Sequence, residues 1–271
     1  MSNSKELAKK IRLHALEMTH LGGSSHIGSI FSIADILAVL YEEVLFFNSK
    51  NPDLENRDRF ILSKGHSGAG VYAALAEKDF FPVSELKKHY SDGSKFSGHV
   101  SHKEVPGVEF STGSLGHGLS VSCGLALSAK LNKQKHKIIC LMSDGECDEG
   151  SNWEAILFSA HHNLDNLITI VDYNKLQSIY SPEQTLNLEP FKDKWEAFGW
   201  NVHEVDGHDH KKLIECFKLK PSNKRPNCII CHTVKGKGVS FMEDNPKWHH
   251  GGIDNKVFEK AMKELIGSRN E

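Results

Sequence analysis

The sequence contains no apolar run long enough to cross a membrane and no recognisable export signal. A helix that spans a bilayer needs about 20 consecutive apolar residues, and no stretch of the 271 residues approaches that length. The start of the chain, Met1 to Lys10, is polar and basic, and no apolar signal core follows it. We therefore expect a soluble protein of the cytoplasm.

The sequence also has little net charge, and its few cysteines lack the pattern of a metal site. A formal net charge of -2 gives no reason to expect a nucleic-acid or anionic membrane partner. Among six cysteines, only Cys228 and Cys231 have metal-like spacing. They lie in an apolar segment, 227–233, typical of a buried strand, where residues three apart point to opposite faces. This argues against zinc and for reduced cysteines in the core.

Signatures of nucleotide binding are missing as well. Glycine-rich turns at 65–70 and 113–118 each precede an expected helix, as nucleotide-binding loops do. Neither turn has the dinucleotide spacing, which places the closer pair of glycines first. No phosphate loop of the glycine-lysine-serine kind is present, so a nicotinamide or nucleotide enzyme is disfavoured.

The sequence does contain apolar segments that alternate with helical patterns along one domain of 271 residues. We expect strands at 59–62, 137–142, 167–172, 201–204 and 228–232. We expect helices at 5–20, at 119–131, and from a capping box at Ser32 and Asp35 to about residue 47. Such alternation predicts an α/β fold, a mostly parallel sheet with helices on both faces. Long loops are expected at about 20–30, 91–118 and 235–252.

Two of the expected strands are followed by residues that suit a hard cation. Asp144 and Gly145 come directly after strand 137–142, and Asn174 follows strand 167–172. Parallel strands end at the same edge of a sheet, where ligands of such folds bind. Carboxylate and amide oxygens there suit Mg²⁺, which keeps open positions for phosphate oxygens.

A helix is expected just beyond, with Ser151 and Glu154 spaced as a capping box. Its free N–H groups would favour an anion. The alternative is that Asp144 and Gly145 form only a turn, and that Asn174 caps a helix.

The run from Ser143 to Glu154, followed by Asn174-Lys175-Leu176, resembles the thiamine diphosphate motif, and the whole chain is similar to the transketolase family. The resemblance implies a thiamine-diphosphate-binding fold. It also implies that Asp144, Asn174 and the Leu176 carbonyl hold Mg²⁺ or another divalent cation such as Ca²⁺.

The same resemblance implies that Gly145 and Glu146 contact thiamine diphosphate. The motif departs from the family at Ser143, which replaces a glycine and leaves the metal carboxylate intact. A longer departure, Ser178 to Tyr180, stands where the family often has Ile-Asp-Gly, so the shape of that loop stays open.

Histidines centre four further segments that are similar to transketolase motifs, among 17 histidines in the chain. Ser25-His26-Ile-Gly28, Ser63-Lys64-Gly65-His66 and Ser97-Gly98-His99 resemble the first three. The resemblance assigns His26, His66 and His99 to substrate hydroxyls, and His66 also to the diphosphate. Imidazoles donate, accept and move protons near neutral pH. The alternative for any single histidine is a structural role, which we expect for His161, His162, His208 and His210.

The resemblance is completed by a glycine turn after the third segment, Thr112 to Gly116, and by a fourth segment, Lys235 to Gly238 followed by Trp248 to Gly251. It implies that Gly113 and Leu115 bring main-chain groups to the aminopyrimidine ring. Lys235, at the start of the fourth segment, is expected to help neutralise the diphosphate. Counting from Lys235 favours His249 as the catalytic and cofactor-binding histidine, whereas adjacency to glycine favours His250.

The resemblance implies an incomplete enzyme. The family activates its cofactor with a glutamate from a second domain, so we expect a separate C-terminal subunit to supply it, in a heterotetramer with two copies of each chain. Glu149 and Glu154 match acidic residues near the family's subunit interface. The expected activity is transfer of a two-carbon ketol unit from a ketose, or ketose phosphate, to an aldose. The alternatives are a subunit of a deoxyxylulose-phosphate synthase-like or 2-oxoacid dehydrogenase-like enzyme, or a non-catalytic scaffold.

Overall fold

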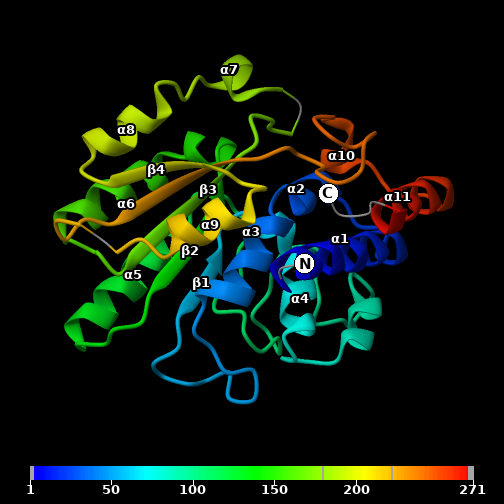
Figure 1. Cartoon of the computed structure of the whole chain (residues 1–271), viewed down its shortest axis with the longest axis horizontal. Helices are drawn as coiled ribbons and strands as arrows, with labels where there is room; N and C mark the ends of the chain where they lie inside the picture. The colour runs from blue at the N-terminus through cyan, green and yellow to red at the C-terminus, as the bar shows by residue number, and fades with distance from the viewer. Residues whose placement is uncertain (1–2, 179, 221, 268–271) are drawn as a thin grey trace.

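A computed structural model describes residues 3–178, 180–220 and 222–267, in which five strands form one sheet in the order β1-β2-β3-β5-β4 (Figure 1). The strands are β1 (Arg59–Leu62), β2 (Ile138–Ser143), β3 (Leu167–Tyr173), β4 (Asn201–Asp206) and β5 (Asn227–His232). Every neighbouring pair is parallel. The predicted α/β class is therefore confirmed. Strand β1 has the expected bounds, and the other four differ from the expected ones by one or two residues at their ends.

Helices cover both faces of this sheet. On one face, the hydrophobic core includes residues of α1 (Asn3–Gly22), α2 (Ile27–Ser32), α3 (Ala34–Val39), α4 (Gly68–Glu77), α9 (His210–Phe217) and α11 (Asn255–Gly267), with α1 packed on α3 and α4 and α11 packed on α1. The other face packs against α5 (Gly118–Leu131), α6 (Gly150–His161) and α8 (Phe191–Ala197). Strand β2 shows why its sequence is continuously apolar: Ile139 and Leu141 enter the first core and Ile138 and Cys140 the second.

The two cysteines with metal-like spacing separate in the same way. Cys228 lies in the second core and Cys231 in the first, on opposite faces of β5, and both thiols are free. The argument against a zinc site at this pair is confirmed.

The segment 20–47 differs from expectation. Helix α1 continues to Gly22 and α2 already begins at Ile27, so the first predicted loop is short. Ser32 is the last residue of α2, and the helix expected from Ser32 is instead divided into α3 and a π-helical turn, Leu40–Val44. Ser32 does not cap it, because its hydroxyl donates to the Asp172 carboxylate at 2.7 Å. Ser32 is buried against the sheet, so its hydroxyl forms a tertiary hydrogen bond and not a local helix cap.

The predicted capping box at Ser151 and Glu154 is also wrong. Helix α6 begins at Gly150, Glu149 stands at its N-cap, and no side chain caps it. The Ser151 hydroxyl instead donates to the Gly116 carbonyl at 2.7 Å, which ties α6 to the loop before α5. The spacing of Ser151 and Glu154 in the sequence could not reveal that the Gly116 carbonyl competes for the Ser151 hydroxyl.

Both other long loops reach the carboxyl ends of the strands, where Leu115, Lys235 and His249 line one pocket. The part of the first loop around Glu109 instead lies near the start of β1, where Glu109 pairs with Arg57. Residues 91–117 contain no helix or strand, and 235–252 contain only the short α10 (Lys247–His250). The remaining short helix, α7 (Pro182–Thr185), follows the segment in which Ile179, at the centre of the Ser178–Tyr180 departure, lies outside the described residues. Within the part of the chain that the structure describes, no helix has the length and apolar character needed for a bilayer crossing.

Candidate active site

The carboxyl ends of β2 and β3 bring Asp144 and Asn174 to one edge of the sheet. The last residue of β2, Ser143, pairs with Asp172, and both predicted metal ligands follow directly. Asp144 Oδ2 accepts the Lys175 N–H at 2.7 Å, which locks the two strand ends together. The predicted juxtaposition of carboxylate and amide is thus observed.

The surroundings of Asp144 disfavour the charged form of its carboxylate. It is 1% exposed, and burial, followed by the negative charge of Asp172, raises its pKa to about 6. A divalent cation would relieve both effects, because it supplies positive charge to a buried anion. The Asn174 Oδ1 and Leu176 carbonyl oxygens at the same edge complete a set of hard oxygen donors. These residues therefore fit the cation that the sequence predicts.

A buried ion pair supports this edge, and sequence reasoning missed it. Lys64 and Asp172 have side chains that are 0% exposed and form a close ion pair. Burial would raise the pKa of Asp172, but the charge and hydrogen bond of Lys64 outweigh it and lower that pKa. Asp172 also accepts a hydrogen bond from the Asn174 amide at 2.9 Å. The available signal was a charged residue that ends the otherwise apolar strand 167–172.

A pocket of about 280 Å³ opens above this edge. Its lining contains eight predicted site residues: His66, Leu115, Asp144, Gly145, Asn174, Leu176, Lys235 and His249. Lys64 and His250 also line it. A larger residue at Gly145 would displace Gln177, because a Cβ there would lie 2.8 Å from Gln177 Cγ. We call this cavity the active-site pocket.

Four predicted site residues do not line the active-site pocket: His26, His99, Gly113 and Glu146. Glu146 is fully buried and accepts hydrogen bonds from the Ser63 hydroxyl and the Gly116 N–H. Its side chain therefore holds the turn beside Leu115 rather than the pocket wall. Gly113 lies next to His99, where an added Cβ would be 3.4 Å from the His99 ring.

The histidines that the sequence singled out meet around His26. Its ring centroid lies 5.1 Å from that of His66, 5.8 Å from His99, 5.1 Å from His249 and 5.2 Å from His250. Burial and then the neighbouring imidazoles lower the pKa of His26 to about 4. Burial and then Lys235 lower the pKa of His249 to about 2. Both rings are neutral at physiological pH, so each can donate one hydrogen bond and accept another.

Lys235 lies between the histidines and the sheet edge that carries Asp144 and Asn174. Its ammonium donates to the Leu176 carbonyl at 2.7 Å, to the Gln177 carbonyl at 3.0 Å and to His249 Nδ1 at 2.9 Å. Burial and then the charge of Lys64 lower the pKa of Lys235 to about 8, so it is still mostly cationic at neutral pH. A buried ammonium at the pocket wall suits an anionic ligand such as a diphosphate.

The nitrogens of His26, His249 and His250 lie within 4.8 Å of one another, close enough for a shared metal ion. The contact with Lys235 argues against that use. An ammonium only donates, so His249 Nδ1 must accept and the proton of the neutral ring sits on Nε2. That arrangement suits a hydroxyl ligand better than a metal. Lining of the pocket does not distinguish His249 from His250 as the catalytic histidine, because both line it.

The remaining predicted residues lie outside the pocket. Glu149 and Glu154 are exposed at the start of α6, and an interface role for them stays a prediction. His161 and His162 are exposed at its end, while His208 and His210 bind the buried Asp35 at 2.7 and 3.0 Å. The surface and structural roles expected of these four histidines agree with their positions.

Three relatives of similar length are named as transketolase subunits. The family model described as the transketolase thiamine diphosphate binding domain matches residues 3–269. An apulose-4-phosphate transketolase subunit of Phocaeicola vulgatus is 40% identical over 259 residues, 95% of this chain and 92% of that protein. A 6-deoxy-6-sulfo-D-fructose transketolase subunit of Clostridium sp. is 37% identical over 259 residues, 95% of this chain and 94% of that protein.

Longer relatives match over only part of their length. Homo sapiens transketolase is 36% identical over 263 residues, which are 96% of this chain but 42% of that protein. The crystal structure of Campylobacter jejuni transketolase superposes with a TM-score of 0.91 at 31% identity, covering 98% of this chain and 43% of that one. The chain thus spans less than half of these single-chain enzymes. It belongs to the transketolase family and matches the family's thiamine diphosphate binding domain over nearly its whole length.

Proposed function

We propose that the chain is the cofactor-holding subunit of an enzyme that transfers a two-carbon ketol unit from a ketose to an aldose. The observation that carries this proposal is one pocket that joins the Asp144–Asn174 edge to neutral histidines through Lys235. The Asp144–Asn174 edge alone would be compatible with many kinds of phosphate-binding protein. The histidines add the groups that a polyhydroxylated substrate requires.

The metal-binding role falls to Asp144, Asn174 and the Leu176 carbonyl, with Mg²⁺ or another divalent cation such as Ca²⁺. Lys235 and Gly145 would contact the diphosphate, the lysine by its charge and the glycine by close approach of its backbone. His66 and His249 line the same pocket and would complete the contacts to cofactor and substrate.

Bound thiamine diphosphate would supply a nucleophilic carbon and an electron sink for cleaving the bond next to a ketose carbonyl. The chain's own contribution is to hold substrate hydroxyls and to move their protons. His26, His66, His99 and His249 are assigned that role. The neutral rings of His26, His66 and His249 at close mutual distance support it, because a protonated imidazole could not accept a hydroxyl proton.

The proposal includes a separate partner chain. Three relatives that match over at least 92% of their own length are named as subunits, whereas the match covers only 42% of Homo sapiens transketolase. We propose that the partner carries the activating glutamate and that two copies of each chain form a heterotetramer. Glu149 and Glu154 are exposed on α6 and would lie near the interface. A cytoplasmic location is part of the same proposal.

The substrate class is an anionic or phosphorylated sugar. Relatives are named for apulose-4-phosphate and for 6-deoxy-6-sulfo-D-fructose, both of which carry an acidic group. The buried cations Lys64 and Lys235 at the pocket wall are compatible with such a ligand. Which sugar serves as donor and which as acceptor is not assigned.

The test combines the chain, its partner subunit, Mg²⁺, thiamine diphosphate and a ketose donor, with product measured as a function of aldose. We expect aldose-dependent ketol transfer for at least one pair in a broad panel of sugar phosphates and sulfo-sugars. Decarboxylation of a 2-oxoacid in its place would favour the dehydrogenase-like alternative, and cofactor binding without turnover would favour the scaffold.

A variant tests the metal site directly. Asp144→Ala should abolish binding of thiamine diphosphate, because the central oxygen donor is removed. Asp193→Ala, a change on the exposed surface of α8, is the matched control and should leave binding intact. Retained binding by Asp144→Ala would show that the metal lies elsewhere.

A further inference from the structure

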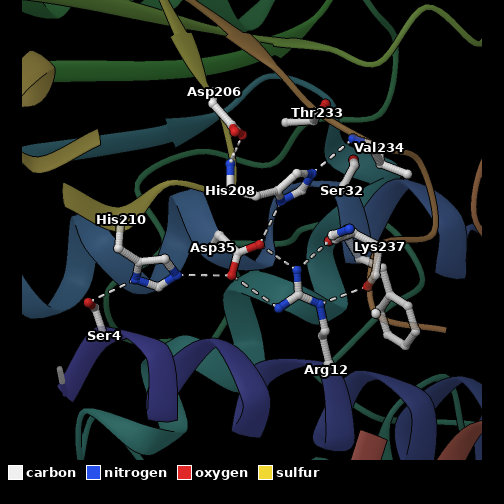
Figure 2. Close-up of polar contacts among 12 residues, drawn as sticks. Ser4, Arg12, Ser32, Asp35, Asp206, His208, His210, Thr233, Val234 and Lys237 are labelled. Carbon is white, nitrogen blue, oxygen red and sulfur yellow. Dashed lines mark hydrogen bonds and ion pairs between the residues drawn. The ribbon is translucent and has the colours of Figure 1, made fainter. Parts of the chain in front are cut away.

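The buried carboxylate of Asp35 on α3 is the centre of a polar network that extends to residues on both sides of Lys235 (Figure 2). Arg12 of α1 donates to it from both terminal nitrogens, at 3.1 and 2.6 Å. His208 Nδ1 and His210 Nε2 contact it at 2.7 and 3.0 Å. Burial would raise the pKa of Asp35, but the charge of Arg12 and the histidine hydrogen bonds hold it well below its usual value. Asp35 is therefore an anion with every neighbour arranged to donate.

Two of these neighbours also bind the turn that carries Lys235. His208 Nε2 accepts the Val234 N–H at 2.9 Å. Arg12 Nε donates to the Lys237 carbonyl at 2.9 Å. Figure 2 shows both contacts on the far side of Asp35 from His210, which reaches Ser4 instead. The turn is thus held one residue before Lys235 and two residues after it.

The contact with Val234 determines where the proton of His208 lies. A main-chain N–H only donates, so Nε2 must be the unprotonated nitrogen of a neutral ring. The proton is then on Nδ1 and points at Asp35. The carboxylate therefore selects the tautomer that can hold the turn, as carboxylates do for histidines behind many functional sites.

The turn fits closely against α1 and α2. Gly238 has φ +100°, and a Cβ there would lie 3.2 Å from Arg12 Cδ. Gly236 donates its N–H to the Gly28 carbonyl at 2.9 Å. The backbone on both sides of Lys235 is consequently set by contacts with α1 and α2 as well as with His208.

We propose that Asp35, Arg12 and His208 are positioning residues for Lys235. By holding the turn they place its ammonium within reach of the Leu176 carbonyl and of His249 Nδ1. The inference rests on the proposed function, in which Lys235 contacts the diphosphate. It assigns a role in cofactor affinity to residues outside the pocket.

The test compares two histidines that share the same buried partner. His208→Ala and His210→Ala each remove one hydrogen bond to Asp35, but only His208 reaches the turn. Calorimetry would follow the binding of thiamine diphosphate and Mg²⁺ to the full chain. Amide hydrogen exchange at residues 234–237 would be measured without ligand. We expect His208→Ala to weaken cofactor binding by about 10–100-fold and to speed exchange in the turn, and His210→Ala to change neither.

Two further variants separate a positioning role from loss of folding. Gln at position 208 offers an oxygen near the place of Nε2 and can accept the Val234 N–H. Asn can donate to Asp35 but does not reach the turn. We expect His208→Gln to recover most of the affinity and slow exchange, and His208→Asn to behave like His208→Ala.

Equal effects of His208→Ala and His210→Ala on affinity and exchange would overturn the inference, as would equal rescue by Asn and Gln. If the unaltered chain fails to bind the cofactor, the proposed function is in error. In that case the exchange rates still decide whether His208 holds the turn.

Discussion

The side-chain amide of Asn174 donates from Nδ2 to the carboxylate of Asp172, two residues earlier, at 2.9 Å. This contact fixes which way the amide faces, because its oxygen must then lie on the opposite side. There Oδ1 accepts the Leu176 N–H at 3.1 Å, at the edge where a cation is expected. Asp172 is in turn paired with Lys64, so a buried ion pair orients the predicted metal ligand.

Asp172→Asn should lower the free energy of unfolding by about 3–5 kcal/mol, since it leaves the Lys64 ammonium buried without a counter-ion. Denaturant unfolding of the metal-free chain measures this. Adding Lys64→Met removes the unpaired charge, and the double variant should recover more than half of the loss. A double variant less stable than Asp172→Asn alone would contradict the account.

The stability of the metal-free protein should respond to the ionisation of Asp144. Its pKa is raised from 3.8 to about 6 in the folded state, so the folded chain binds this proton more tightly than the unfolded chain does. The contribution is fully present below pH 4 and is lost as the pH rises through 6, by about 3 kcal/mol at 1.36 kcal/mol per pKa unit.

A bound cation should cancel this loss by pairing with the carboxylate. We therefore expect Mg²⁺ to raise the melting temperature more at pH 7.5 than at pH 5. Asp144→Asn should remove the difference between the two pH values, as thermal unfolding with and without Mg²⁺ can measure. An equal effect of Mg²⁺ on the unaltered chain at both pH values would place the cation away from Asp144.

Gly116→Ala should loosen the turn beside Leu115. Gly116 has φ +83°, and a Cβ there would lie 2.6 Å from Ser151 Oγ and 2.7 Å from Glu149 Cβ. We expect a loss of about 1–3 kcal/mol in unfolding free energy together with weaker cofactor binding.

Gly124→Ala is the matched control for Gly116→Ala. Gly124 lies inside α5 with no atom within 4 Å of an added Cβ, and alanine should stabilise the helix by about 0.5–1 kcal/mol. Chemical denaturation of both variants measures the contrast. Destabilisation of similar size at the two positions would rule out a special demand for glycine at Gly116.

Alanine substitutions should resolve the choice between His249 and His250. His249 contacts Lys235 at 2.9 Å and is partly buried, whereas His250 is exposed at the rim. We expect His249→Ala to lower kcat/KM by about 100-fold or more and His250→Ala to lower it much less. Steady-state assays with the partner subunit would show the difference, and a larger effect at His250 would reverse the assignment.

Much of the fold was predictable because it depends on local pattern. Continuous apolar segments such as 138–142 specify strands buried on both faces, and their alternation with helices specifies a parallel sheet. The capping boxes at Ser32 and Ser151 were wrong, because each hydroxyl binds an acceptor far away in the sequence. Spacing reveals a local hydrogen bond that can form but not the tertiary bond that replaces it.

The sequence by itself determined the chemistry of the site: Asp144 and Asn174 after adjacent strands, and motif-embedded histidines such as His26. Only the tertiary structure decided how these groups are supported. Lys64 meets Asp172 over 108 positions of sequence and His208 meets Asp35 over 173, through the packing of helices onto the sheet. The physical reason is that residue type fixes what a group can bind, whereas its partner, burial and charge state depend on which elements fold against it.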